Sequence, residues 1–168
     1  MKPASLEPRR EAIRVNLTLP VTRIGFGFLS FDPLEQMIGA PISELLEPLL
    51  AGPVTRRPSA AGAAIEVYPL ALPEGEGATI PLGSFGEIGF ANERGLLVLT
   101  VPWSMAGWLR ERLGAAIVRG PEAGTSLDGT ARVATAWVRL RPGMRAAVPL
   151  GALGECGVEA GPQVRSSA

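Results

Sequence analysis

The sequence lacks the side chains on which most enzyme and metal sites depend. Its 168 residues include no histidine, one lysine (Lys2), one cysteine (Cys156) and two aspartates. Without imidazole the chain can form neither a Ser-His-Asp nor a Cys-His nucleophile, and no His-ligated metal site. A single thiol excludes an internal disulfide and a Cys-ligated zinc or iron–sulfur site within the chain. We therefore expect no metal and no cofactor.

Nucleotide-binding and hydrolase fingerprints are missing as well. The chain contains no G-x-G-x-x-G segment, no Walker loop and no G-x-S-x-G elbow. Lys2 lies close to the terminus, where a Schiff-base role is not expected. Any catalysis would therefore depend on Glu, Tyr, Arg, Ser or Thr side chains.

Charge and hydropathy predict neither a nucleic-acid partner nor a membrane partner. The 16 basic and 16 acidic residues cancel, so no net field attracts nucleic acid or anionic lipid. Nearly all the basic residues are arginine, a bias typical of a GC-rich bacterial genome. No run of 18 apolar residues is present, and the opening segment MKPASLEPRREA lacks the apolar core of a signal peptide. The expected location is the cytoplasm, with no transmembrane segment.

Hydrophobic periodicity predicts a β-rich chain. Residues 11–21 alternate between apolar and polar side chains, which predicts a half-buried strand. Residues 93–101 are apolar on both faces, which is typical of a central strand. Pro69 indicates an edge or a bend in a third strand at 65–72. Further strands are expected at 23–30 and on both sides of Pro142-Gly143, with loops at 55–64 and 120–131.

Two segments have helical periodicity. The first covers residues 33–50, where Asp32 is a suitable N-cap and where Gly39 and Pro41 divide the apolar stripe into two short helices. The second covers residues 103–118. The chain is long enough for one core, so we expect a single globular domain at 11–160 between flexible ends at 1–10 and 161–168.

One segment of the chain occurs twice in similar form. TIPLGSFGEIGF (79–90) and AVPLGALGECGV (147–158) are identical at six of twelve positions. Proline ends ladder pairing, and glycine permits positive φ or close strand crossing, so each copy is expected to turn a corner of the fold. Two such corners predict an α+β, β-rich fold with a pseudo-two-fold repeat, either a small barrel or a sandwich, with two to three covering helices.

The repeat places a glutamate at the same position in each copy, Glu87 and Glu155. If a two-fold axis brought the two carboxylates together, one would have a raised pKa and could act as a general acid or base. They are the candidate catalytic residues of the chain. The alternative interpretation is that both are polar turn residues that face solvent.

Aromatic side chains are the candidate ligand-binding residues. Trp103, Trp108 and Trp137, together with Tyr68, could line an apolar site, because indole offers a large face and an N–H donor. The alternative is a place in the core.

The segment PRREAIRV (8–15) resembles the opening of PilZ domains, whose R-x-x-x-R motif binds the phosphates of cyclic di-GMP. The resemblance implies a nucleotide-binding role for Arg10 and Arg14. The second motif of that family, [D/N]-x-S-x-x-G, is degenerate around Ser84, where Leu82 and Glu87 replace the Asp or Asn and the Gly.

These observations favour a non-catalytic, β-rich binding module for a small apolar molecule or a peptide. The mean hydropathy of +0.24 in so small a domain predicts a homo-oligomer. Three alternatives stay open. They are an enzyme of the cyclase or isomerase type that uses paired carboxylates, a structural or assembly protein, and a degenerate PilZ-like nucleotide-binding domain.

Overall fold

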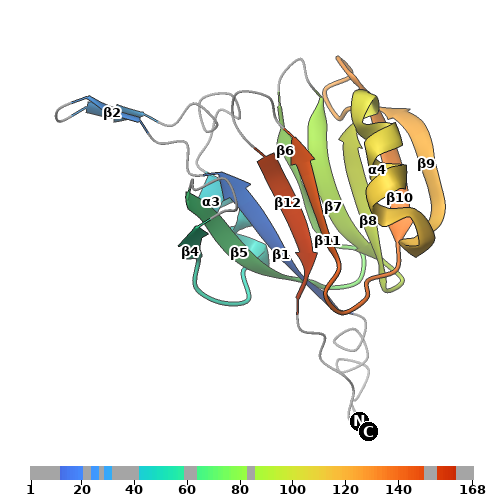
Figure 1. Ribbon diagram of the computed structural model, residues 1–168, viewed down its shortest axis with the longest axis horizontal. Helices are drawn as coiled ribbons and strands as arrows, with labels where there is room; N and C mark the ends of the chain where they lie inside the picture. Colours follow the sequence, from blue (N-terminus) through green and yellow to red (C-terminus); the bar gives the residue numbers. More distant parts are fainter. Residues whose placement is uncertain are drawn as a thin grey trace, which may run out of the picture.

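The structure, a computed structural model, describes residues 12–20, 24–26, 29–31, 42–58, 64–82, 86–149 and 155–161. Two antiparallel five-stranded sheets make up most of it, and two short helices lie beside them (Figure 1). The prediction of a β-rich chain with helices is confirmed at this level. Each sheet is open and has two edge strands, so the described residues form no closed barrel.

The first sheet has the strand order β11-β12-β1-β5-β4, with β1 at its centre. Pro69 lies in β5, beyond the residues with which β4 pairs. Its carbonyl accepts a hydrogen bond from Ala51 N at 2.8 Å and therefore points away from β1. The N–H that proline lacks would point to the same side of β5, where few ladder bonds form. The strands of this sheet are β1 (Ile13–Pro20), β4 (Thr55–Pro58), β5 (Ala64–Leu72), β11 (Arg145–Pro149) and β12 (Glu155–Ala160).

The second sheet has the order β6-β7-β8-β10-β9, with β8 at its centre. A separate pair, β2 (Ile24–Phe26) with β3 (Leu29–Phe31), forms a two-stranded sheet. The strands of the second sheet are β6 (Gly77–Pro81), β7 (Glu87–Glu93), β8 (Leu96–Pro102), β9 (Ile117–Thr125) and β10 (Arg132–Val138).

Two predicted loops are wrong in part. The edge strand β9 occupies the first half of 120–131, and the edge strand β4 lies within 55–64. Most residues of both strands are exposed, so neither strand has the apolar alternation that identifies a half-buried strand.

The helices are short and contribute to the core. The expected helix at 103–118 is α4 (Ala106–Leu113) between two 3₁₀ turns, η4 (Trp103–Met105) and η5 (Gly114–Ala116). Of the expected pair at 33–50, α3 (Ile42–Leu46) and the 3₁₀ turn η2 (Glu47–Leu49) are described, and residues 33–41 lie outside the described ranges. In the part of the chain that the structure describes, every helix is too short or too polar to cross a membrane.

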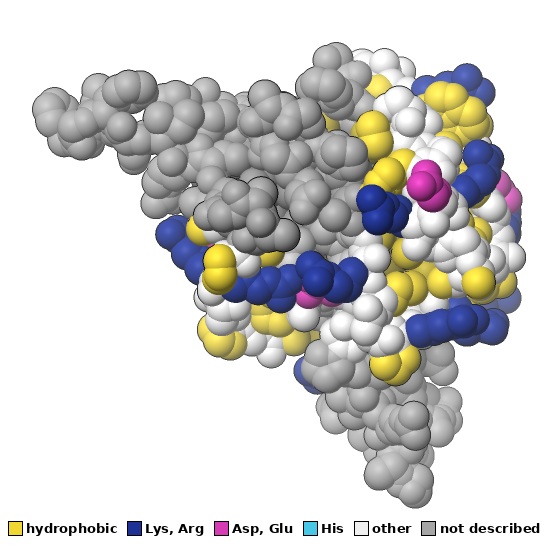
Figure 2. Space-filling model, viewed as in Figure 1, with side chains coloured by type: hydrophobic (Ala, Val, Ile, Leu, Met, Phe, Trp, Pro, Cys, Tyr) yellow, Lys and Arg dark blue, Asp and Glu magenta, His cyan; other side chains and the backbone are white. Residues whose placement is uncertain are grey.

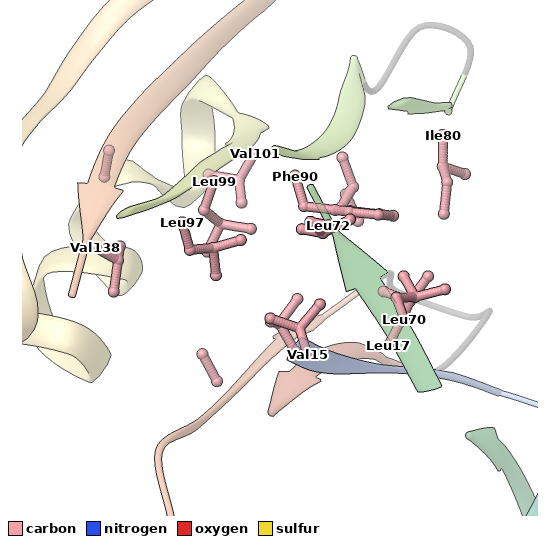
Figure 3. Close-up of a cluster of buried hydrophobic side chains, with 14 of the residues drawn as sticks. Val15, Leu17, Leu70, Leu72, Ile80, Phe90, Leu97, Leu99, Val101 and Val138 are labelled. Atoms are coloured by element: carbon pink, nitrogen blue, oxygen red, sulfur yellow. The ribbon is translucent and has the colours of Figure 1, made fainter. Parts of the chain in front are cut away.

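The core lies between the two sheets. Figure 3 shows Val15 and Leu17 of β1 pointing toward Leu97 and Phe90 of the second sheet. Leu46 of α3 and Leu109 of α4 are fully buried in the same cluster. The helix α3 follows the central strand of the first sheet and contacts β6 of the second sheet. The helix α4 follows the central strand of the second sheet and contacts β11 of the first sheet.

Both sheets are assembled from the same sequence of elements. A central strand (β1 or β8) is followed in the chain by a helix, an edge strand (β4 or β9) and an inner strand (β5 or β10), and the β2–β3 pair is inserted between β1 and its helix. The chain then continues into a hairpin that joins the other sheet: β6–β7 lies beside β8, and β11–β12 lies beside β1. Each sheet therefore contains three strands from one half of the chain and a hairpin from the other half.

The repeated segments form these two hairpins in the same register. Pro81 lies opposite Glu87 in β6–β7, and Pro149 lies opposite Glu155 in β11–β12. Each copy thus ends one strand at its proline and begins the next at its glutamate, as expected for a segment that reverses the chain.

A glycine of the repeat faces a threonine on the central strand in both sheets. Gly89 lies opposite Thr100, and Gly157 lies opposite Thr18. A Cβ on Gly157 would lie 2.4 Å from Thr18 Oγ1, and a Cβ on Gly89 would lie 3.4 Å from Thr100 Cβ. These glycines leave room for the neighbouring threonine side chain.

Candidate functional site

The two glutamates of the repeat belong to different sheets. Glu87 begins β7 and is 8% exposed, and its Oε1 accepts a hydrogen bond from Leu127 N at 2.8 Å. Glu155 begins β12, and its side chain lies outside the described residues. The described partner of Glu87 is thus a backbone amide in a distant loop, and the pairing of the two carboxylates stays a prediction.

Two of the three tryptophans and the tyrosine pack against the core. Tyr68 is 5% exposed, and its hydroxyl donates to Glu66 Oε1 at 3.1 Å. Trp103 and Trp108 are half-buried against the core cluster, each with an arginine side chain over its ring. These three rings therefore lie among hydrophobic neighbours, and a ligand-binding role for them stays a prediction.

Of the two arginines in the PilZ-like motif, Arg14 lies among the described residues. Arg10 lies outside the described residues. Arg14 lies on β1, on the outer face of the first sheet. Arg57 and Arg145 lie on the same face, and both form ion pairs with Glu159. Figure 2, which views the molecule from this side, shows basic side chains in a row across the sheet.

The outer face of the second sheet has a different character. We call it the Trp137 face. Its positions alternate along the strands with buried core residues such as Leu97, Leu99 and Ala136. Two rows cross the sheet through directly paired residues: Gly77, Ala91, Val98, Trp137 and Arg119 in the first, and Thr79, Gly89, Thr100, Thr135 and Glu122 in the second.

Trp137 is held from two sides on this face. Its Nε1–H donates to Glu93 Oε2 at 2.9 Å, and the Arg119 guanidinium lies 4.1 Å from the centre of its ring. Arg119 in turn donates to both carboxylate oxygens of Glu122, at 2.8 and 3.2 Å, and these bonds raise the pKa of the guanidinium above its usual value. These two contacts therefore fix the orientation of the indole ring.

The middle of the Trp137 face carries no charge. Thr100 and Thr135 are half-buried and join their hydroxyl groups at 3.1 Å, and Ala91 and Val98 next to them are also half-buried. The solvent side of an antiparallel sheet is ordinarily polar, with frequent charged side chains. On this face the described charged side chains lie at the ends and edges of the sheet: Glu87, Glu93, Arg119, Glu122 and Arg139.

A loop held by side-chain hydrogen bonds lies at one end of the Trp137 face. Residues 126–131 connect β9 to β10, and Glu87 holds this loop through Leu127 N. Asp128 Oδ1 accepts bonds from Ser126 Oγ, Thr130 N and Thr130 Oγ1, which lower the pKa of the carboxyl to about 2. The Leu127 side chain is 82% exposed at the tip of this fixed loop.

The structure thus brings two predicted site residues, Glu87 and Trp137, to one face of one sheet. Arg119, Glu122 and Leu127 were not predicted as site residues, because Arg119 follows the expected helix at 103–118 and the other two lie in the expected loop at 120–131. The one signal in the sequence is the spacing of three residues between Arg119 and Glu122, which form an ion pair in the structure.

No protein-family model, curated protein or solved structure matches the chain. The PilZ resemblance therefore stays an expectation that rests on Arg10 and Arg14. Among the described residues, no group of three or more acidic or cysteine side chains lies close enough to hold a metal ion.

Proposed function

We propose that the chain is a non-catalytic protein-binding module made of two equivalent halves, and that it binds its partner on the Trp137 face. The first half runs from β1 to β7 and the second from β8 to β12. The two halves are related as a pseudo-two-fold repeat in which each gives its hairpin to the sheet of the other.

The order and register of the strands support the equivalence of the halves. Every pairing in one sheet has its counterpart in the other: Asn16 lies between Glu159 and Pro69 as Val98 lies between Ala91 and Trp137. The central strands also match in sequence. LTLP of β1 (17–20) corresponds to LTVP of β8 (99–102).

The equivalence supplies an internal control for the Trp137 face. One scaffold is present twice, so residues that the fold itself requires should agree between the halves. On the outer faces they differ at each position of the first row. Where the first sheet has Arg145, Glu159, Asn16 and Pro69, the second has Gly77, Ala91, Val98 and Trp137. The loss of charge is specific to one half, which supports a binding role there rather than a structural one.

Exposure differs in the same direction. Thr18 and Val67, on the first sheet, are 7% and 8% exposed, whereas their counterparts Thr100 and Thr135 are half-buried. The positions that are buried on the outer face of the first sheet are thus more exposed on the outer face of the second sheet. An accessible, uncharged sheet face is a typical protein-binding surface.

The chemistry of the face favours a protein over a small apolar molecule. Trp and Arg are the residue types that most often dominate binding at protein interfaces, and Trp137 with Arg119 is already fixed in place. Fixing these side chains beforehand lowers the entropy cost of association. The space between the sheets, where a small ligand was an alternative, is occupied by the side chains of the core cluster.

Site-specific photo-cross-linking in cells tests the proposal. A photoreactive amino acid at Val98 should form covalent adducts, because this position lies in the middle of the Trp137 face. The same amino acid at Asn16, the counterpart on the first sheet, is the matched control and should form few adducts. Adducts of equal yield at both positions, or none at Val98, would contradict the proposal.

A further inference from the structure

We infer that the partner on the Trp137 face is a second copy of this chain, packed face to face about a two-fold axis that runs along β8. The inference rests on the proposed function, since it names the occupant of the same face. Three properties of the face support it: its area, the arrangement of its charges, and the small size of the side chains along its middle.

The area is sufficient for a small dimer interface. Five strands at about 4.8 Å spacing and three outward positions along each strand give a face of roughly 24 Å by 20 Å. Two copies would then bury roughly 1,000 Å² in total, at the lower limit of specific interfaces. Interfaces of this size are typical of weak or transient association, so we expect the dimer to dissociate in the micromolar range or above.

The charges around the face are complementary to themselves. Glu93 ends β7, and Arg139 follows β10, so the two flank β8 on opposite sides. Both residues are exposed. A two-fold axis along β8 lays β7 of one copy over β10 of the other, and this brings Glu93 of each copy toward Arg139 of its mate. These two charges and the Arg119–Glu122 pair cancel, and the remaining carboxylate, Glu87, is buried beneath the Leu127 loop, so two copies meet with little repulsion.

The side chains nearest the axis permit close packing of the two sheets. Thr100 lies on β8 itself, with Gly89 on one side and Thr135 on the other. Two sheets pack face to face at about 10 Å when their side chains interdigitate. Glycine and threonine leave a shallow, even surface at this point, into which the Trp137 ring of the mate can settle.

Sedimentation equilibrium over a range of concentrations gives the first test. The parent should convert from the 17.5 kDa chain to twice that mass in the micromolar range. Val98→Arg should weaken the dimer at least about 100-fold, because it buries an unpaired charge at the axis. Asn16→Arg, the matched control on the first sheet, should leave the dimer unchanged. Circular dichroism of both variants confirms that they are folded.

Thiol cross-linking tests the axis. In a Cys156→Ser background, Thr100→Cys lies beside the axis, so its symmetry mate is about 10 Å away and a short bismaleimide should join the two chains. Thr79→Cys, two strands from the axis on the same row, would be roughly 20 Å from its mate and should not be joined.

Two results would overturn the inference. One is a parent that stays at 17.5 kDa at every concentration. The other is a dimer that Val98→Arg does not weaken or that cross-links better at position 79 than at position 100. If photo-cross-linking at Val98 yields adducts with other proteins while the purified chain stays monomeric, the second-copy inference fails and the binding face stands. If Val98 yields no adduct of any kind, the proposed function fails as well.

Discussion

Replacing Gly157 by alanine should destabilise the fold, and the same replacement at Gly89 should not. A Cβ on Gly157 would lie 2.4 Å from Thr18 Oγ1, and Thr18 is 7% exposed on a central strand. Threonine is branched at Cβ and has few rotamers, so it cannot simply turn away. Relief must come from a shift of β12 against β1, and such overpacking costs about 1–3 kcal/mol.

The equivalent position in the other half is a matched control. A Cβ on Gly89 would lie 3.4 Å from Thr100 Cβ, close to ordinary contact. Alanine there also reduces the entropy of the unfolded chain, so Gly89→Ala should change the free energy of unfolding by less than about 1 kcal/mol. Thr18→Ala removes the clashing hydroxyl and should restore most of the stability that Gly157→Ala loses.

Urea unfolding followed by tryptophan fluorescence measures these differences. With a slope of about 2 kcal/mol/M, Gly157→Ala should lower the midpoint by roughly 0.5–1.5 M, and Gly89→Ala should leave it nearly unchanged. A larger loss at Gly89 than at Gly157, or no recovery in the Gly157→Ala/Thr18→Ala double variant, would refute the packing explanation for the repeated glycine.

Three other predictions concern the Trp137 face and its loop. Glu87→Gln should lower the free energy of unfolding by about 1–2 kcal/mol, because a neutral amide replaces the carboxylate that accepts from Leu127 N, and urea unfolding measures the loss. The pKa of Asp128 is about 2 in the folded chain and 3.8 without its partners, so its contribution to stability is present above pH 3.8 and is lost as the pH falls toward 2. NMR titration of the carboxyl should give the lower value, and a midpoint near 3.8 would contradict the bonded loop. Trp137→Ala should weaken association at the face about tenfold or more in sedimentation experiments, whereas Trp108→Ala should not.

The parts of the fold that the sequence predicted are those with strong local patterns. β1 lies within the predicted strand at 11–21, and β8 (Leu96–Pro102) overlaps most of the predicted strand at 93–101, because the first alternates and the second is apolar on both faces. The repeat was visible as sequence identity, and both copies form hairpins in the same register. The exchange of hairpins between the halves could not be predicted, since it depends on pairings between strands that are distant in the sequence.

The edge strands β4 and β9 were not predicted, and the reason is physical. β9 has a neighbour on one side only, and most of its side chains face solvent, so glycine, proline and glutamate are tolerated as they are in a loop. The helix at 103–118 was predicted too long because its apolar spacing continues through η5 into Ile117 and Val118, which begin β9.

The residues of the candidate site were harder to predict than the fold. Local sequence gives Glu87 as a turn residue, and its burial results from a loop 40 positions away. Trp137 was one of three candidate tryptophans, and nothing in its neighbourhood distinguished it from Trp103 or Trp108. The Trp137 face was singled out for the proposed function by comparing the two outer faces, and this comparison requires the strand registers.

Hydroxyl-radical footprinting of the three tryptophans tests the central claim most directly, because the chain carries its own controls. The oxidation rate of each indole can be followed by mass spectrometry in dilute protein and again at high concentration or in cell extract. We predict that Trp137 is protected in the concentrated or extract sample, whereas Trp103 and Trp108, which pack against the core, react at unchanged rates. An unchanged rate at Trp137 in both samples, or protection of Trp103 or Trp108 in its place, would contradict the assignment of the binding surface to the Trp137 face.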